Sequence, residues 1–143
     1  MNIIDLDNQT NETINIYILE QIAQSLTTRK IELIITDNET IQELNREYRA
    51  KDTATDVLSF PIDLNIPSMP LGSIVISFDF VKEKSTIFKH TLEDELSLLF
   101  IHGLLHLLGY DHEVDSGEMR SREKNIIETF SLPASLIVRT EEY

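Results

Sequence analysis

A long apolar segment, FIHGLLHLLGYDH at residues 100–112, sets the centre of the predicted fold. From Leu98 onward the chain is apolar nearly all round a helix, a pattern typical of a helix buried on every side. The sequence TLED at residues 91–94 resembles a capping box with Asp94 in the place of the usual Glu or Gln, and it would begin this helix. We therefore predict a stiff central helix, buried by Leu96, Leu99, Phe100, Leu104 and Leu107.

The same segment carries three of the four histidines of the chain. His102 and His106 are four residues apart, an offset of about 400° on a helix, so both imidazoles leave one face. Gly109 can adopt the left-handed conformation that ends a helix, and His112 can then return towards the same point. Three neutral nitrogens with a fourth position open to water are typical of a catalytic zinc site. A single histidine on such a helix is more often a core residue, but three at this spacing favour one zinc ion per chain.

The spacing HxxxHxxGxxH is also that of the metzincin peptidases, HExxHxxGxxH. In those enzymes the glutamate after the first histidine is the general base. Gly103 occupies that position here, and glycine has no side chain that could take a proton from water. The peptidase interpretation therefore lacks its central chemical group.

HGLLHLLGYDH closely resembles the signature of the YbeY family of bacterial endoribonucleases, which are metal-dependent ribosomal RNA maturation factors. Two further blocks, REYRAKDTATDVLSFP at residues 46–61 and LGSIVIS at residues 71–77, are similar to other parts of that family. Glu118, Met119 and Glu123 also stand where the family tends to carry similar residues. The resemblance runs from residue 46 to about residue 128. It departs at Ser73, where the family usually has Asp, so no role of that acid is carried over.

This resemblance implies a zinc-dependent, single-strand-specific endoribonuclease that matures the 3′ end of small-subunit ribosomal RNA and serves ribosome quality control. The implied partners are single-stranded RNA, ribosomal RNA and the ribosome, with no membrane and no DNA. It also implies a catalytic role for Arg49, which matches the arginine of the second block. A guanidinium group suits this role because its planar fork matches a phosphate. By position alone, Arg49 would more often be a cation that caps the end of a helix.

The charge balance limits how this chain can bind RNA. It has 25 acidic and 12 basic residues, a net charge of −13, so it lacks the broad positive field of many RNA-binding proteins. Phosphate contacts must therefore be local. The candidates are Arg46, Arg49 and Lys51 in one block and Lys82, Lys84 and Lys89 in another, of which the second group is more typical of ordinary surface lysines.

Cysteine is absent, so a transition metal must be held by histidine or carboxylate, which suits a reducing cytoplasm. The N-terminus has no basic leader followed by an apolar core, and no apolar run approaches the roughly 18–20 residues of a membrane span. We expect a cytoplasmic protein.

Hydrophobic periodicity predicts a single α+β domain over residues 1–143, with a small mixed sheet of about four strands covered by helices. Strands are expected at residues 2–6, 30–36, 57–60 and 71–77, with 57–60 at a sheet edge because Pro61 follows. Helices are expected at residues 12–28, 39–49, 78–88 and 118–130 besides the central one. In the second of these, Ile41, Leu44 and Tyr48 should face the core. Residues 63–70 are expected to be a loop, and the tail to Tyr143 to be loosely held.

Other polar residues remain ambiguous at this level. Asp111 could orient a ligand histidine by accepting its second N–H, or it could stabilise the turn after Gly109. Asp56 could cap a strand or pair with a basic residue. His90 lies outside the metal spacing and is expected to be an ordinary residue where a helix begins.

Two other functions stay open on the residues alone. A zinc metallopeptidase or amidase-like hydrolase would use the same three ligands with another base, for which Glu113 is a candidate. A non-catalytic, zinc-stabilised module that docks on the ribosome or a partner protein would need the metal only for folding.

Overall fold

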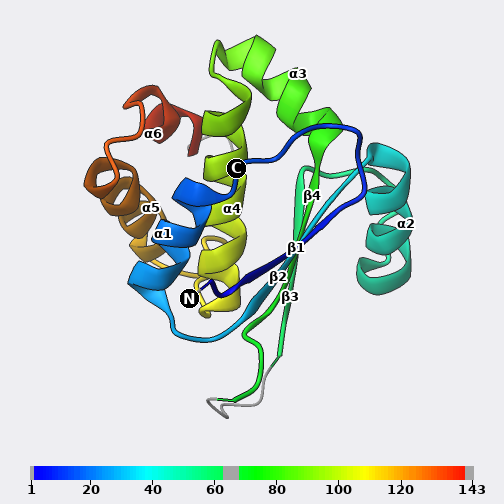
Figure 1. Cartoon of the computed structure of the whole chain (residues 1–143), viewed down its shortest axis with the longest axis horizontal. Helices are drawn as coiled ribbons and strands as arrows, with labels where there is room; N and C mark the ends of the chain where they lie inside the picture. Colours follow the sequence, from blue (N-terminus) through cyan, green and yellow to red (C-terminus); the bar gives the residue numbers. More distant parts are fainter. Residues whose placement is uncertain (1, 63–67, 141–143) are drawn as a thin grey trace.

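A four-stranded mixed sheet forms the middle layer of the computed structural model, which describes residues 2–62 and 68–140 (Figure 1). The strands are β1 (Ile4–Asn8), β2 (Ile31–Thr36), β3 (Val57–Pro61) and β4 (Gly72–Ser77), in the spatial order β1-β2-β4-β3. β1 and β4 both run parallel to β2, whereas β3 pairs with β4 in the antiparallel sense. The predicted α+β class with a small mixed sheet is confirmed, and β3 lies at the sheet edge as its terminal proline predicts.

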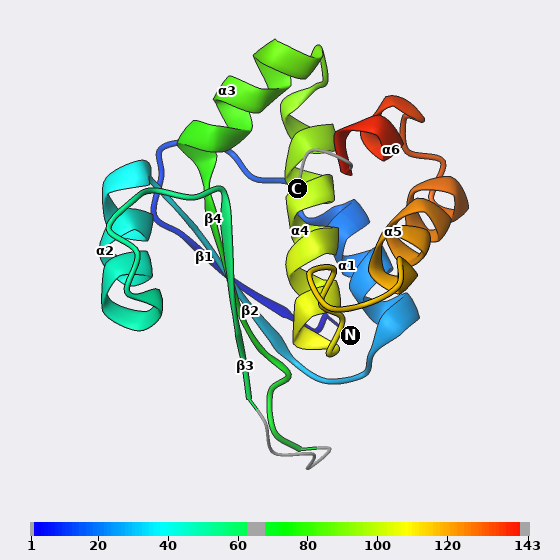
Figure 2. The ribbon, with the colours of Figure 1, turned by 180° about the vertical axis from the view of Figure 1, so that it is seen from behind.

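Helices cover both faces of this sheet (Figures 1 and 2). One face carries α4 (Leu92–Leu107), with α1 (Tyr17–Leu26), α5 (Glu118–Thr129) and α6 (Ser135–Thr140) around it. The other face carries α2 (Asn38–Arg49), and α3 (Phe78–Phe88) continues from the end of β4. Among the described residues, no helix combines the length and the apolar character that a membrane crossing requires.

α4 is the buried central helix that the apolar segment predicts. Every residue from Glu95 to Leu105 is buried, and the Thr91 hydroxyl accepts a hydrogen bond from the Asp94 N–H at 3.1 Å, which caps the helix. Its side chains form one core with the strands and with α1 and α5. The burial fixes the position of this helix, and with it the position of the histidines near its end.

The first helix is shorter than its periodicity predicts. α1 begins at Tyr17, because side chains bond the backbone ahead of it: Asn8 Nδ2 donates to the Glu12 carbonyl at 2.7 Å, and Asn15 Oδ1 accepts from the Tyr17 N–H at 3.0 Å. Such side-chain bonds compete with helix formation. β1 is also displaced towards the C-terminus, because its parallel pairing with β2 extends from Ile4 to Asn8.

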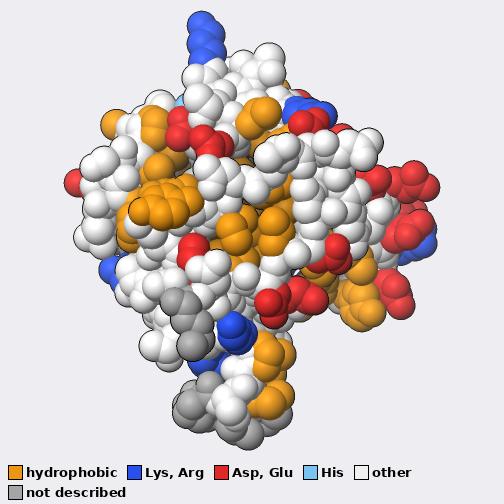
Figure 3. Space-filling model, viewed as in Figure 1, with side chains coloured by type: hydrophobic (Ala, Val, Ile, Leu, Met, Phe, Trp, Pro, Cys, Tyr) orange, Lys and Arg blue, Asp and Glu red, His pale blue; other side chains and the backbone are white. Residues whose placement is uncertain are grey.

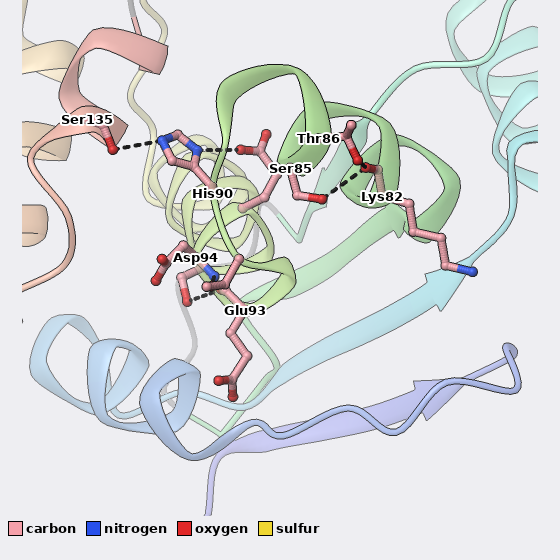
Figure 4. A network of polar contacts seen from close by, with 10 residues as sticks. Lys82, Ser85, Thr86, His90, Glu93, Asp94 and Ser135 are labelled. Carbon is pink, nitrogen blue, oxygen red and sulfur yellow. Dashed lines mark hydrogen bonds and ion pairs between the residues drawn. The ribbon is translucent and has the colours of Figure 1, made fainter.

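The expected loose tail is wrong for the residues that the structure describes. α6 packs against the rest of the protein with Leu136 fully buried. Ser135 Oγ lies 2.8 Å from His90 Nε2 (Figure 4). His90 Nδ1 lies 3.3 Å from Oε2 of the buried Glu95. His90 is therefore a buried polar link between α4 and α6. Residues 141–143 of the tail and residues 63–67 of the expected loop lie outside the described part of the chain.

Candidate active site

The structure brings the three predicted ligand histidines together at the end of α4. His102 and His106 project from successive turns, and their Nε2 atoms lie 3.2 Å apart. His112 approaches from the loop that follows, with its ring centroid 5.4 Å from that of His102 and 5.9 Å from that of His106. One nitrogen from each of the three lies within 4.8 Å of the others.

A glycine turn returns the chain to this point. Gly109 has a φ of +100°, and the following N–H, of Tyr110, donates to the Leu105 carbonyl at 3.0 Å. This closure is typical of a helix that ends at a left-handed glycine. The Tyr110 carbonyl in turn lies 3.0 Å from His106 Nδ1. The turn therefore both places His112 and orients His106.

Hydrogen bonding sets which nitrogens can bind a metal. The Tyr110 carbonyl can only accept, so His106 Nδ1 carries the proton and His106 Nε2 presents its lone pair. His102 Nδ1 lies 3.4 Å from a carboxylate oxygen of Glu123, an electrostatic contact that favours the proton on Nδ1 and leaves the lone pair on His102 Nε2. Two ligand nitrogens at about 2.0–2.1 Å from one tetrahedral ion lie about 3.3–3.4 Å apart. The 3.2 Å separation therefore fits two ligands of one metal ion.

The electrostatic surroundings keep His106 neutral. Burial lowers the pKa of His106 below its usual range, and the neighbouring His102 lowers it further. A neutral imidazole is the form that binds a metal. The site can therefore hold a transition metal at neutral pH without first losing a proton from His106.

Glu123 is the residue that reasoning from the sequence left without a role. It lies on α5 with only 1% of its surface exposed, and its Oε1 faces His102 Nδ1. Of the two roles that the sequence leaves open for Asp111, the structure supports the second, because its carboxylate accepts from the Glu113 N–H at 3.0 Å and so stabilises the turn after Gly109. Because Glu123 is 21 residues from His102, no local spacing indicates the contact. Only its position in the family pattern singles it out.

We expect Glu123→Gln to weaken zinc binding by roughly 10- to 100-fold, because the amide cannot reproduce the charge that orients and polarises His102. Chelator competition on the folded protein measures this affinity. Glu128→Gln, an exposed position on the same helix, is the matched control and should bind zinc as the parent does. Equal affinity in the Glu123 variant and the parent would show that this carboxylate does not support the ligand.

A cleft of about 650 Å³ opens over the three histidines. Its walls come from the end of α2 and the following loop, from β3, and from the loop after α4. Arg49 and Lys51 line it as cations, and Asp56, Asp111 and Glu113 line it as acids. A closed structural metal site would have no such opening, so the geometry favours a site that receives a substrate.

Arg49 reaches this cleft from the last turn of α2. Its Nη2 donates to the Ser59 carbonyl on β3, and its guanidinium carbon lies 5.2 Å from the centroid of the Phe60 ring. The end of α2 is closed by the backbone, with Ala50 in the left-handed conformation and the Lys51 N–H bonded to the Asn45 carbonyl. The contacts of Arg49 thus join it to β3, and they do not cap its own helix.

The other candidate cations fall into two groups. Lys51 lies in the cleft beside Arg49, whereas Arg46 faces Asp52 at 3.7 Å on the surface. Lys82 pairs with Glu12 at 2.7 Å, as expected of an ordinary surface lysine. The structure therefore brings two cations of the first basic block into the cleft that the three histidines line.

Asp56 and Ser73, two polar residues noted in the sequence, each make a hydrogen bond within the fold. Asp56 Oδ1 accepts from the Val57 N–H at 2.8 Å, which caps the start of β3. Ser73 Oγ donates to Glu32 Oε1 at 2.7 Å. The departure from the family pattern at Ser73 thus affects a contact between β4 and β2.

The packing around Gly103 explains why this chain has no side chain where the metzincins carry their general base. A Cβ atom at Gly103 would lie 2.8 Å from Ile74 Cγ2, 3.2 Å from Ser59 Oγ and 3.3 Å from Val57 Cγ2. The position therefore faces the sheet and allows α4 to pack closely on β3 and β4. Ser59 Oγ uses this closeness to donate to the Gly103 carbonyl at 3.0 Å.

We expect Gly103→Ala to lower the free energy of unfolding by about 1 kcal/mol. Overpacking costs about 1–3 kcal/mol, which exceeds the gain of up to about 1 kcal/mol in helix propensity. Urea denaturation measures the change. Ser121→Ala, at an exposed position of α5, should be neutral or slightly stabilising. A Gly103→Ala protein more stable than the parent would contradict the close packing.

Comparisons with known proteins point to one family. The family model described as "Endoribonuclease YbeY" matches residues 2–131. A protein of that name from Sulfurovum sp. is 63% identical over 144 residues, covering 97% of this chain and 98% of its own. Another from Helicobacter pylori is 51% identical over 140 residues, covering 97% and 99%. The solution structure of TM1509 from Thermotoga maritima matches with a TM-score of 0.56 and 34% identity, over 78% of this chain and 75% of that one.

Proposed function

We propose that this chain, which belongs to the YbeY endoribonuclease family, holds one zinc ion through His102, His106 and His112 and uses it to cleave single-stranded RNA. The observation that carries the proposal is the 3.2 Å distance between the Nε2 atoms of His102 and His106, which line an open cleft. With a proton on each Nδ1, as the Tyr110 carbonyl and the Glu123 carboxylate favour, the two Nε2 atoms present lone pairs to each other. Such a pair repels itself unless a cation lies between the nitrogens. A divalent metal ion bound to both nitrogens removes this repulsion. Because the donors are imidazole nitrogens and the chain has no cysteine, zinc suits the site.

When bound, a zinc ion with three imidazole ligands supplies a Lewis acid and lowers the pKa of a coordinated water towards about 7. Gly103 is compatible with this chemistry, since the water then needs no carboxylate beside it. Arg49 is assigned to the phosphate at which the chain is cut. Its anchored guanidinium presents donors where negative charge develops on the non-bridging oxygens.

The cleft also supports RNA as the substrate. Because the protein carries a net charge of −13, phosphates can be attracted only where cations gather, and the described structure places Arg49 and Lys51 in the cleft. We assign the substrate to ribosomal RNA, at the 3′ end of the small-subunit RNA, with a further role in ribosome quality control in the cytoplasm. DNA and membranes are not part of this proposal.

The decisive experiment combines metal analysis with a cleavage assay on one purified sample. Matched single-stranded RNA, double-stranded RNA and single-stranded DNA are incubated with the protein, with and without chelator. We expect one zinc per chain, cleavage of single-stranded RNA alone, loss of activity with chelator, and recovery on adding zinc. Zinc-dependent hydrolysis of casein without RNA cleavage would instead establish the peptidase alternative, with Glu113 in the cleft as its candidate base.

A further inference from the structure

Tyr48 occupies an unusual position on α2. On the helix it lies within about 20° of Ile41, which is fully buried, so it belongs to the stripe that faces the sheet. The helical pattern accordingly predicts a core residue. In the structure, however, 61% of Tyr48 is exposed, so that prediction is wrong. The last turn of α2 places this ring near the sheet edge and leaves it in contact with solvent.

The Tyr48 ring packs against the ring of Phe60 on β3. The two ring centroids are 5.6 Å apart with planes at 71°, an edge-to-face contact. Phe60 in turn packs on the small buried cluster of Ile41, Leu58 and Val75 between α2 and the sheet. The exposed tyrosine therefore rests on a fixed base. We call Tyr48 and Phe60 together the aromatic platform.

The aromatic platform is continuous with the cleft through β3. Alternate residues of an edge strand point to opposite faces, so Phe60 faces α2 while Ser59 faces α4 and contacts Gly103. Arg49 bridges the two faces, because it donates to the Ser59 carbonyl and lies over the Phe60 ring. A strand of RNA that leaves the histidines past Arg49 therefore meets this platform next.

Negative charge on α2 restricts where a strand of RNA could cross this helix. Glu39, Glu43 and Glu47 are exposed and follow one another at four-residue steps on a different side of the helix from Tyr48. Acidic side chains gather over α2 at the right-hand side of Figure 3. These acids repel phosphates, so a nucleic acid that crosses α2 is favoured to do so at the end of the helix beside Arg49.

We propose that Tyr48 stacks on the base of the nucleotide next to the phosphate that Arg49 contacts. The inference rests on the proposed endoribonuclease function and assigns Tyr48 as a positioning residue for single-stranded substrate. Base stacking on an aromatic ring suits a single strand because the base faces are then free, and it tolerates any sequence because every base has such a face. Duplex RNA keeps its bases stacked on one another and gains nothing from the platform.

The test measures KM and kcat on a single-stranded RNA oligonucleotide. We expect Tyr48→Ala to lower kcat/KM by roughly 5- to 100-fold, chiefly through KM, and Tyr48→Phe to remain within about twofold of the parent. Tyr17→Ala is the matched control, since Tyr17 is 67% exposed on α1, and it should cleave as the parent does. Zinc content and the thermal midpoint should be unchanged in all three variants.

A series of oligonucleotides with one abasic site at each position separates stacking from a structural role. At one position beside the cleaved bond, the parent should lose as much activity as Tyr48→Ala loses on the intact RNA, and the variant should lose nothing more. Parental kcat/KM in Tyr48→Ala, or an equal loss on every abasic substrate, would overturn the stacking role and leave the endoribonuclease function intact. A parent protein that cuts no RNA would overturn both.

Discussion

We expect His106→Ala to lose the proposed zinc and to cleave RNA at least about 100-fold more slowly than the parent, while it stays folded. Removing one of three ligands lowers metal affinity steeply, and without the metal the site has no activated water. The fold survives because the core lies along the buried length of α4, whereas His106 is only partly buried at its end. Elemental analysis, circular dichroism and the RNA assay on one sample measure the three quantities.

His90→Ala is the matched control for this experiment. His90 is the fourth histidine, and it contacts Glu95 and Ser135 away from the proposed ligands. We expect its loss to lower stability, because Glu95 is fully buried, and to leave zinc at one per chain. If His106→Ala unfolds as the metal is lost, the metal serves folding and the non-catalytic module becomes the better description. If it keeps stoichiometric zinc, the ligands are misassigned.

Arg49→Ala and Arg49→Lys should each lower kcat by roughly 10²- to 10³-fold with zinc content unchanged. Removing one aimed donor from a charge that develops in the transition state costs about 2.7–4 kcal/mol. Lysine is a poor substitute because it lacks the planar fork that contacts two oxygens at once. Because Arg49 is exposed, its contacts with Ser59 and Phe60 should contribute little to stability, and thermal unfolding should remain near that of the parent.

Arg46→Ala controls for the loss of a nearby positive charge. Arg46 lies one turn earlier on α2 and faces Asp52 on the surface, so its removal should change RNA cleavage little. Undiminished cleavage by Arg49→Ala would remove the phosphate-binding role. Reduced stability with normal cleavage would instead show that Arg49 serves only to join α2 to β3.

Packing between elements far apart in the sequence decided several contacts that local sequence patterns could not predict. Periodicity places Tyr48 on the inner face of α2, but its exposure depends on where the sheet ends beneath the helix. Glu123 meets His102 only because α5 packs beside α4. A side chain at Gly103 would be crowded because Ile74, on β4, lies directly against that position. None of these contacts has a fixed spacing along the chain, because each depends on the relative placement of two elements.

The sequence by itself determined the central helix and the three-histidine cluster. A helix repeats every 3.6 residues, so residues four apart share a face whatever surrounds them, and a left-handed glycine ends the helix wherever it occurs. His102, His106 and Gly109 obey these local rules, and the structure brings the three imidazoles together as the spacing predicts. Apart from the family resemblance, only the tertiary structure decided that Arg49 reaches the same cleft from the opposite face of the sheet, because that contact requires Arg49 to pass over the edge strand β3.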